Sequence, residues 1–144
     1  MYKILLATDG SEHSSRAAEE VLKLAHPMQA SITAISVVQG TPIYTGYDVP
    51  ASPWITMEYL EEQEKAGQKI LDQAAAFFRE NGFNVDLILE KGRAADIICQ
   101  VAKDNNYDLI AMGSRGLGGI KQLFLGSVSS AVIHSAETPV LVVK

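Results

Sequence analysis

The sequence predicts a single α/β domain over residues 1–144, built on an open parallel sheet with helices on both faces. Three observations favour this fold class. Short apolar runs alternate along the chain with longer segments whose apolar residues recur at helical spacing. These runs carry apolar residues on both faces, which is typical of strands that are covered on both sides. The length of 144 residues is that of one ordinary domain.

The predicted strands are short apolar runs, and the second of them is rich in β-branched residues. They lie at Ile4–Ala7, Ser31–Val38, Val85–Leu89, Leu109–Met112 and Val140–Val143. The first run leads into Asp9-Gly10-Ser11, and the fourth leads directly into a cluster of glycines.

The predicted helices fill the segments between these runs. Apolar residues from Ala17 to Ala25 recur at helical spacing, and this helix is expected to stop before Pro27, because a residue that precedes proline disfavours helical dihedrals. Glycines and prolines punctuate residues 40–54, which predicts a long loop. The remaining helices are predicted at Ile55–Glu80, Ala94–Lys103 and Val128–Ala136.

The alternation of these elements predicts a Rossmann-like, five-stranded parallel sheet, for which we expect the strand order 3-2-1-4-5. Such a sheet binds its ligand at the carboxyl ends of the strands, where the direction of winding reverses. That point lies beside the first strand. The residues after the first and fourth strands, Asp9 and the glycine cluster, are therefore the candidate site.

Composition and charge narrow the classes of partner. The formal net charge of −5 and the absence of clustered Lys and Arg argue against a general nucleic-acid-binding protein. A small phosphorylated ligand remains compatible with this charge, because backbone N–H groups can hold a phosphate. The three histidines show no metal-ligand spacing, so no metal site is predicted.

The expected location is the cytoplasm, without a membrane partner. Cys99 is the only cysteine, which rules out an intrachain disulfide and fits a reducing compartment. The apolar run near the N-terminus is too short for a signal peptide. No stretch approaches the roughly 20 apolar residues that a membrane span needs.

The glycine cluster has a spacing that suits a phosphate. Two residues separate Gly113 from Gly116, and nine more separate Gly116 from Gly126-Ser127. Without a side chain at Gly113, backbone N–H groups can approach a ligand. The last helix begins near Ser127, where open N–H groups and the helix dipole favour an anion. The alternative interpretation is structural: turn glycines, with Ser127 as an N-cap residue only.

The pattern Gly-x2-Gly-x9-Gly-Ser resembles the nucleotide signature of the ATP-binding universal stress proteins, and the sequence matches it residue for residue. The resemblance covers the whole chain. It includes the opening segment 4–11, the segment 108–113 and the ending 138–143.

This resemblance implies ATP or AMP as ligand, accompanied by Mg²⁺. It places Ala7 and Asp9 near the nucleoside and Val37 against the adenine. Met112 and Gly113 would touch the nucleoside or the ribose. The phosphate side of the pocket would be formed by Arg115, Gly116, Gly126, Ser127, Val128 and Ser129.

The implied function is a regulatory, stress-response module with at most slow ATP hydrolysis and no dedicated catalytic residue. The sequence shows no nucleophile–base pair, and no Walker lysine follows the glycines. The alternative is an adenylyl-transferring or ATP-hydrolysing enzyme of the adenine nucleotide α-hydrolase-like group. Such an enzyme needs a second substrate site, for which 144 residues leave little room.

The last predicted strand also suggests a homodimer. In the order 3-2-1-4-5 the run Val140, Leu141, Val142 and Val143 lies at an edge of the sheet. An apolar edge invites aggregation unless something covers it, and two copies can pair such edges around a two-fold axis. The family resemblance points the same way. The alternative is a monomer in which Lys144 and a neighbouring loop shield the edge.

Overall fold

The computed structural model describes residues 1–40, 53–117 and 125–144. Within these ranges strands and helices alternate along the chain, as predicted. In order they are β1 (Lys3–Ala7), α1 (Glu12–Met28), β2 (Ser31–Val38), α2 (Pro53–Glu80), β3 (Val85–Lys91), α3 (Ala94–Asp104), β4 (Leu109–Gly113), α4 (Ser127–Ser135) and β5 (Val140–Val143). Most of the predicted loop at residues 40–54 lies outside the described residues.

The strands form one parallel sheet in the order β3-β2-β1-β4-β5, which confirms the predicted topology. The central strand β1 pairs with β2 on one side and with β4 on the other. At its end, Ala7 lies opposite Ile35 of β2 and Met112 of β4. The carboxyl ends of these three strands therefore lie side by side, where the sequence predicts the site.

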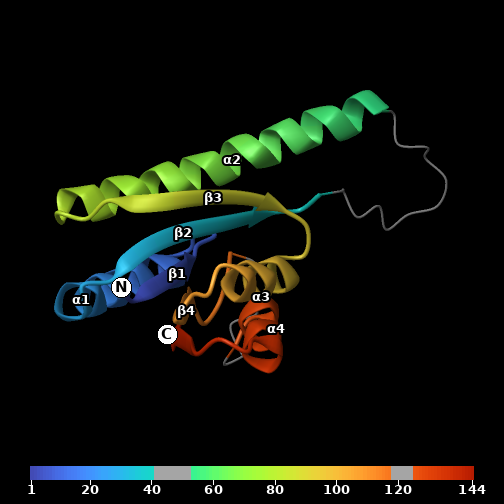
Figure 1. Ribbon diagram of the computed structural model, residues 1–144. Helices are drawn as coiled ribbons and strands as arrows, with labels where there is room; N and C mark the ends of the chain where they lie inside the picture. The colour runs from blue at the N-terminus through green and yellow to red at the C-terminus, as the bar shows by residue number, and fades with distance from the viewer. Residues whose placement is uncertain (41–52, 118–124) are drawn as a thin grey trace.

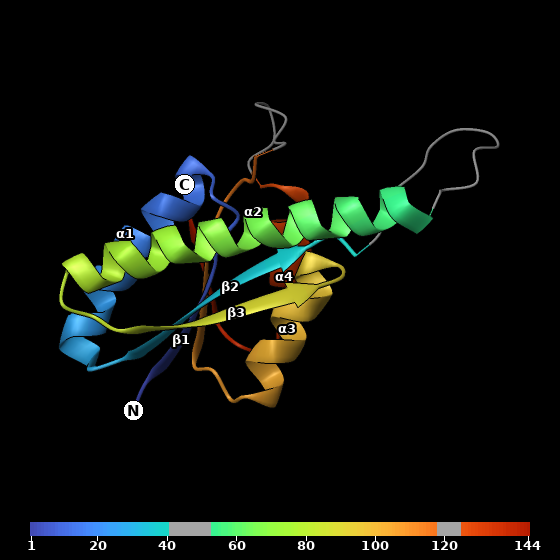
Figure 2. The same cartoon turned by 90° about the horizontal axis from the view of Figure 1, so that it is seen from above.

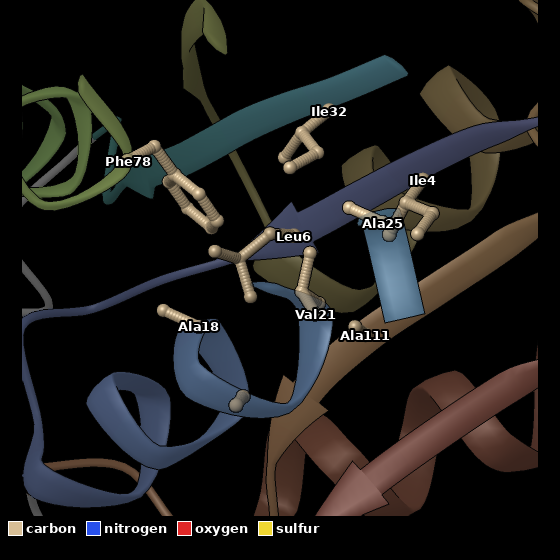
Figure 3. Close-up of a cluster of buried hydrophobic side chains, with 9 residues drawn as sticks. Ile4, Leu6, Ala18, Val21, Ala25, Ile32, Phe78 and Ala111 are labelled. Atoms are coloured by element: carbon tan, nitrogen blue, oxygen red, sulfur yellow. The ribbon is translucent and has the colours of Figure 1, made fainter. Parts of the chain in front are cut away.

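Helices cover both faces of the sheet. The helices α1 and α2 pack on one face, and α3 and α4 pack together on the other (Figures 1 and 2). Successive residues of β1 point to opposite faces, so Leu5 contributes to the core under α3 and α4, whereas Leu6 packs under α1 and α2 (Figure 3). Both side chains are fully buried, which contributes about 2 kcal/mol each and explains why the run Ile4–Ala7 is apolar.

The helix α1 runs past Pro27, so the predicted stop before this residue is wrong. The proline lies in the last turn, where its missing N–H removes a single helical hydrogen bond. The helix is closed by Gln29, which has a left-handed φ of 48°. Its N–H bonds to the carbonyl of His26, and the N–H of Ala30 bonds to that of Ala25 at 3.1 Å. This paired closure fixes the end of the helix.

The two edge strands differ in how they face solvent. The prediction that every strand is covered on both faces is wrong for β3, where Asp86, Leu87 and Glu90 are exposed. The helices α2 and α3 cover this edge strand only in part. Every residue of β5, by contrast, is half-buried. Among the described helices, none is both long and apolar enough to cross a lipid bilayer.

Candidate functional site

A pocket of about 400 Å³ opens at the carboxyl ends of β1, β2 and β4, against the first turn of α4. Its volume lies in the range of small-molecule sites. The fold brings all the residues selected from the sequence to the wall of this pocket. They are Ala7, Asp9, Val37, Met112, Gly113, Arg115, Gly116, Gly126, Ser127, Val128 and Ser129. Their contacts with a ligand remain predictions.

The wall also contains residues that the sequence analysis did not select. They are Thr8, Ser14, Ile35, Ala94, Ile98, Leu117 and Leu125. Helical periodicity places Ile98 on the inward face of its helix, but this signal does not separate a core residue from a pocket residue. Thr8 lies between two selected residues and could have been found from its place after the first strand.

One side of the pocket is apolar. Ile35 and Val37 of β2, Met112 of β4, and Ala94 and Ile98 of α3 form this side, and all belong to or pack against the core beneath α3 and α4. Ile35 is almost fully buried, whereas Val37 is half-buried. Val37 therefore offers apolar surface on which a flat ring could lie.

The opposite side begins with a tight turn after β1. Asp9 shapes this turn, because its Oδ1 accepts a hydrogen bond from the N–H of Ser11 at 2.9 Å. Gly10 has a φ of +79°, which residues with a side chain rarely adopt. Ser11 is the N-cap of α1, and its Oγ accepts from the N–H of Ser14 at 3.2 Å. Asp9 therefore has a structural role, and it also lines the pocket.

Gly116 makes room for this carboxylate. A Cβ atom at Gly116 would lie 2.5 Å from Oδ2 of Asp9. A side chain at this position would push the carboxylate aside, so the glycine allows the segment after β4 to approach the turn after β1. Gly116 thus allows two segments of the pocket wall to contact each other.

Gly113 also serves packing against α1, a role that the sequence did not predict. A Cβ atom there would lie 2.6 Å from the carbonyl carbon of His13 and 2.8 Å from the backbone nitrogen of Ser14. Real Cβ atoms do not approach a backbone this closely. The missing side chain therefore lets the first turn of α1 lie on the end of β4.

The helix α4 begins at Ser127, and its N-cap is Gly126, with an extended backbone at φ −72° and ψ 169°. The alternative in which Ser127 is the N-cap is therefore wrong, because the N-cap is the last residue outside helical dihedrals. Gly126 has no side chain that could cap this helix. The first N–H groups of an α-helix have no partner within the helix, and here Ser127 and Val128 place them at the pocket.

Ser114 connects the start of α4 to the sheet. Its carbonyl accepts hydrogen bonds from the N–H of Gly126 at 2.7 Å and from the hydroxyl of Ser129 at 2.8 Å. Its own N–H donates to the carbonyl of Val143, the last residue of β5, at 2.7 Å. Both Ser114 and Ser129 are buried. The N–H of Gly126 is thus already used in this bond.

The charges around the pocket are balanced. Among the described lining residues, Asp9 and Arg115 are the ionisable side chains. An anion would therefore depend largely on the backbone N–H groups and dipole of α4, which favour negative charge. In the part of the chain that the structure describes, no group of three or more His, Cys, Asp or Glu residues is arranged to hold a metal ion.

Comparisons with known proteins agree with this architecture. The model of the universal stress protein family matches residues 1–144. Universal stress protein YxiE of Bacillus subtilis is 36% identical over 146 aligned positions, which cover 99% of this chain and 98% of that protein.

Solved structures of the same family are similar over nearly the whole chain. Universal stress protein UspA from Lactobacillus plantarum superimposes with a TM-score of 0.85 at 26% identity, covering 99% of this chain and 97% of that one. A universal stress protein solved in complex with cAMP superimposes with a TM-score of 0.73 at 25% identity, with the same coverage of 99% and 97%.

Proposed function

Because the chain belongs to the universal stress protein family, we propose that it binds an adenine nucleotide, ATP or AMP, as a member of the ATP-binding subgroup. One observation carries the proposal: the apolar side of the pocket and the uncapped start of α4 lie at the wall of the same pocket. A nucleotide has the matching pair of chemical parts, a flat base and an anionic phosphate. The related structure in complex with cAMP adds support.

The proposed pose follows the two kinds of wall. The adenine lies against Val37, on the apolar side that Ile35 and Ile98 complete. The nucleoside lies beside Ala7, Asp9 and Met112. The phosphates lie toward the first turn of α4 at Ser127 and Val128, where open N–H groups and the helix dipole favour an anion.

Mg²⁺ fits this site only as a companion of the phosphates. The described lining offers Asp9 as a carboxylate, and one of its oxygens already accepts a hydrogen bond from Ser11. Magnesium in nucleotide sites commonly keeps several waters and takes its other ligands from one or two carboxylates and from phosphate oxygens. Asp9 could supply such a ligand, and the ion would neutralise phosphate charge in a pocket with few cations.

The residues that line the pocket are compatible with a regulatory module that hydrolyses ATP slowly at most. Efficient hydrolysis needs a group that positions or deprotonates the attacking water. In the described lining, Asp9 is the one carboxylate, and its bond to Ser11 fixes it within a turn. We infer that the nucleotide acts mainly as a bound signal in a stress response.

Thermal unfolding with different nucleotides tests the proposal. MgATP should stabilise the protein more than MgGTP. The phosphate end of the pocket does not distinguish between bases, whereas the surface around Val37 is expected to select adenine. At a concentration 100-fold above its Kd, ATP should raise the free energy of unfolding by about 2.7 kcal/mol. That corresponds to a rise in Tm of roughly 5–10 °C.

Equal shifts with both nucleotides would contradict the adenine pocket, and no shift with either would contradict nucleotide binding. Mass spectrometry of nucleotide released from freshly purified protein identifies the resident ligand and separates ATP from AMP.

We also propose that the protein forms a homodimer through β5. The other edge strand, β3, carries the charged residues Asp86, Glu90 and Lys91, which discourage pairing. The edge of β5 consists of Val140, Leu141, Val142 and Val143, without a charge. Two copies related by a two-fold axis can pair these edges antiparallel.

Val142→Pro is a sharp test of this dimer. The carbonyls of Pro139 and Val143 bond to β4, so the alternation of a parallel ladder leaves the N–H groups of Val140 and Val142 on the open edge. Proline at position 142 removes one of these donors and spares the bonds to β4. Light scattering should show a dimer for the wild type and a monomer for a folded Val142→Pro variant. A wild-type mass near 15.6 kDa at micromolar concentration would refute the dimer.

A further inference from the structure

We propose that Ser129 is a positioning residue: through Ser114 it holds the first turn of α4 in place and so sets the preference for phosphate-bearing over phosphate-free nucleosides. This inference rests on the proposed nucleotide function. It assigns to Ser129 a role different from the ligand contact that the family resemblance implies.

The hydroxyl of Ser129 is already engaged. Its side chain is buried, with 2% of the residue exposed. Its Oγ lies 2.8 Å from the carbonyl oxygen of Ser114 and 3.1 Å from that of Gly126. A hydroxyl has one proton to donate, and two carbonyl acceptors already compete for it. Ser129 therefore has no second proton for a phosphate oxygen.

The carbonyl of Ser114, which accepts the hydrogen bond from Ser129, is anchored to the sheet. Ser114 follows β4 directly, and its N–H is bonded to Val143 at the end of β5. Its carbonyl takes hydrogen bonds from two points of the α4 start, the N–H of Gly126 and the hydroxyl of Ser129. Two bonds from residues one turn apart fix both the position and the rotation of this turn.

The phosphate end of the pocket depends on that placement, whereas the base end does not. The N–H groups of Ser127 and Val128 can bind an anion only if they point into the pocket, and hydrogen bonds weaken steeply as their angle departs from linear. The apolar side comes from β2, β4 and α3. Loss of the Ser129 hydroxyl should therefore weaken the binding of phosphate and leave the binding of the nucleoside unchanged.

The first experiment compares adenosine, AMP and MgATP by isothermal titration calorimetry on wild type and Ser129→Ala. We expect the Kd of adenosine to change by less than twofold and the Kd values of AMP and MgATP to rise about tenfold, which is the loss of about one hydrogen bond to a charged group. The matched control is Ser130→Ala, an exposed neighbour on the same helix, which should leave all three Kd values unchanged.

The second experiment uses ligand-free protein. If Ser129 positions the turn, the N–H of Gly126 should exchange with solvent faster in Ser129→Ala than in the wild type, because one of the two bonds that hold the turn is gone. A residue that only contacts the ligand would not alter this rate. Ser129→Cys, which replaces the hydroxyl with a slightly larger thiol that is only a weak donor, repeats both measurements if the alanine variant does not fold.

The outcomes separate the inference from the proposed function. Wild-type protein that binds neither adenosine nor the nucleotides would overturn the proposed function and this inference with it. Wild-type protein that prefers ATP over adenosine, together with a Ser129→Ala variant that keeps the same preference, would overturn the inference alone. A uniform loss for all three ligands would also overturn it, since that result indicates a general loss of structure.

Discussion

The helices α1 and α4 both begin at the carboxyl edge of the sheet, yet only α1 caps its own first turn. At α1 the N-cap is Ser11, whose hydroxyl accepts from the N–H of Ser14. At α4 the N-cap is Gly126, without a capping side chain. In both helices the third residue is a buried serine whose hydroxyl lies close to the N-cap carbonyl, at 2.9 Å for Ser14 and 3.1 Å for Ser129.

This difference indicates that the start of α1 stabilises the fold, whereas the start of α4 is available for binding. The start of α1 uses its polar groups mostly within its own turn, through Ser11, Ser14 and Asp9. The Ser11 hydroxyl makes one longer contact outside the turn, to the carbonyl of Arg115 at 3.4 Å. The start of α4 is anchored from behind, at Ser114, and leaves its foremost N–H groups to the pocket. Changes near α1 should therefore act on folding, whereas changes at the front of α4 should act on nucleotide binding.

The largest expected effect is that of Gly113→Val. The new side chain would collide with the backbone of α1 at His13 and Ser14. Backbone atoms cannot move aside as a flexible side chain can, so we expect the free energy of unfolding to fall by about 3 kcal/mol or more. Urea denaturation followed by circular dichroism measures this loss. A variant as stable as the wild type would show that α1 does not need this close approach.

Gly126→Val should weaken nucleotide binding and have little effect on stability. A Cβ atom at this position would have its nearest neighbour at 3.4 Å, so the fold has room for it. The expected cost in stability is about 1 kcal/mol, since valine is a poorer N-cap residue than glycine. Nucleotide binding should weaken at least tenfold, because the side chain would stand where phosphate is expected. Wild-type affinity in a fluorescent ATP-analogue titration would mean that Gly126 serves only the turn.

Much of the fold could be predicted because its signals are local. The strands Ser31–Val38 and Val140–Val143 begin and end where their apolar, β-branched runs begin and end. The alternation of strands and helices predicted a parallel sheet, and the expected strand order is confirmed. The predicted helix end before Pro27 was wrong because a C-terminal closure at Gln29, formed by backbone hydrogen bonds, lets the helix continue for two more residues, to Met28.

The parts of the site that were missed depend on tertiary placement. The spacing of glycines marks Gly113, but it does not reveal the close approach to His13, which is distant in the sequence. The pair Gly126-Ser127 does not reveal which residue is the N-cap, because that depends on backbone dihedrals. The apolar side at Ile35, Ala94 and Ile98 is invisible to a motif, since core residues and pocket residues carry the same periodicity.

The smallest expected effects on stability come from removing one hydroxyl at the start of α1 and one at the start of α4. This pair of variants compares the two helix starts most directly. Ser11→Ala removes the cap of α1 and should lower the free energy of unfolding by about 1 kcal/mol, which urea denaturation resolves. Ser127→Ala should change it by less than about 0.5 kcal/mol, because Ser127 is exposed and caps nothing.

Nucleotide affinity should reverse this order of effects. Ser127 lies at the pocket wall beside the foremost N–H groups of α4, so loss of its hydroxyl should raise the Kd of MgATP severalfold. Ser11 is the cap of the other helix and does not line the pocket, so Ser11→Ala should leave that Kd within twofold once the protein is folded. Titrating both variants under conditions where each is fully folded keeps stability and binding separate. If Ser127→Ala proved as destabilising as Ser11→Ala, α4 would have a side-chain cap after all, and the contrast between the two helix starts would disappear.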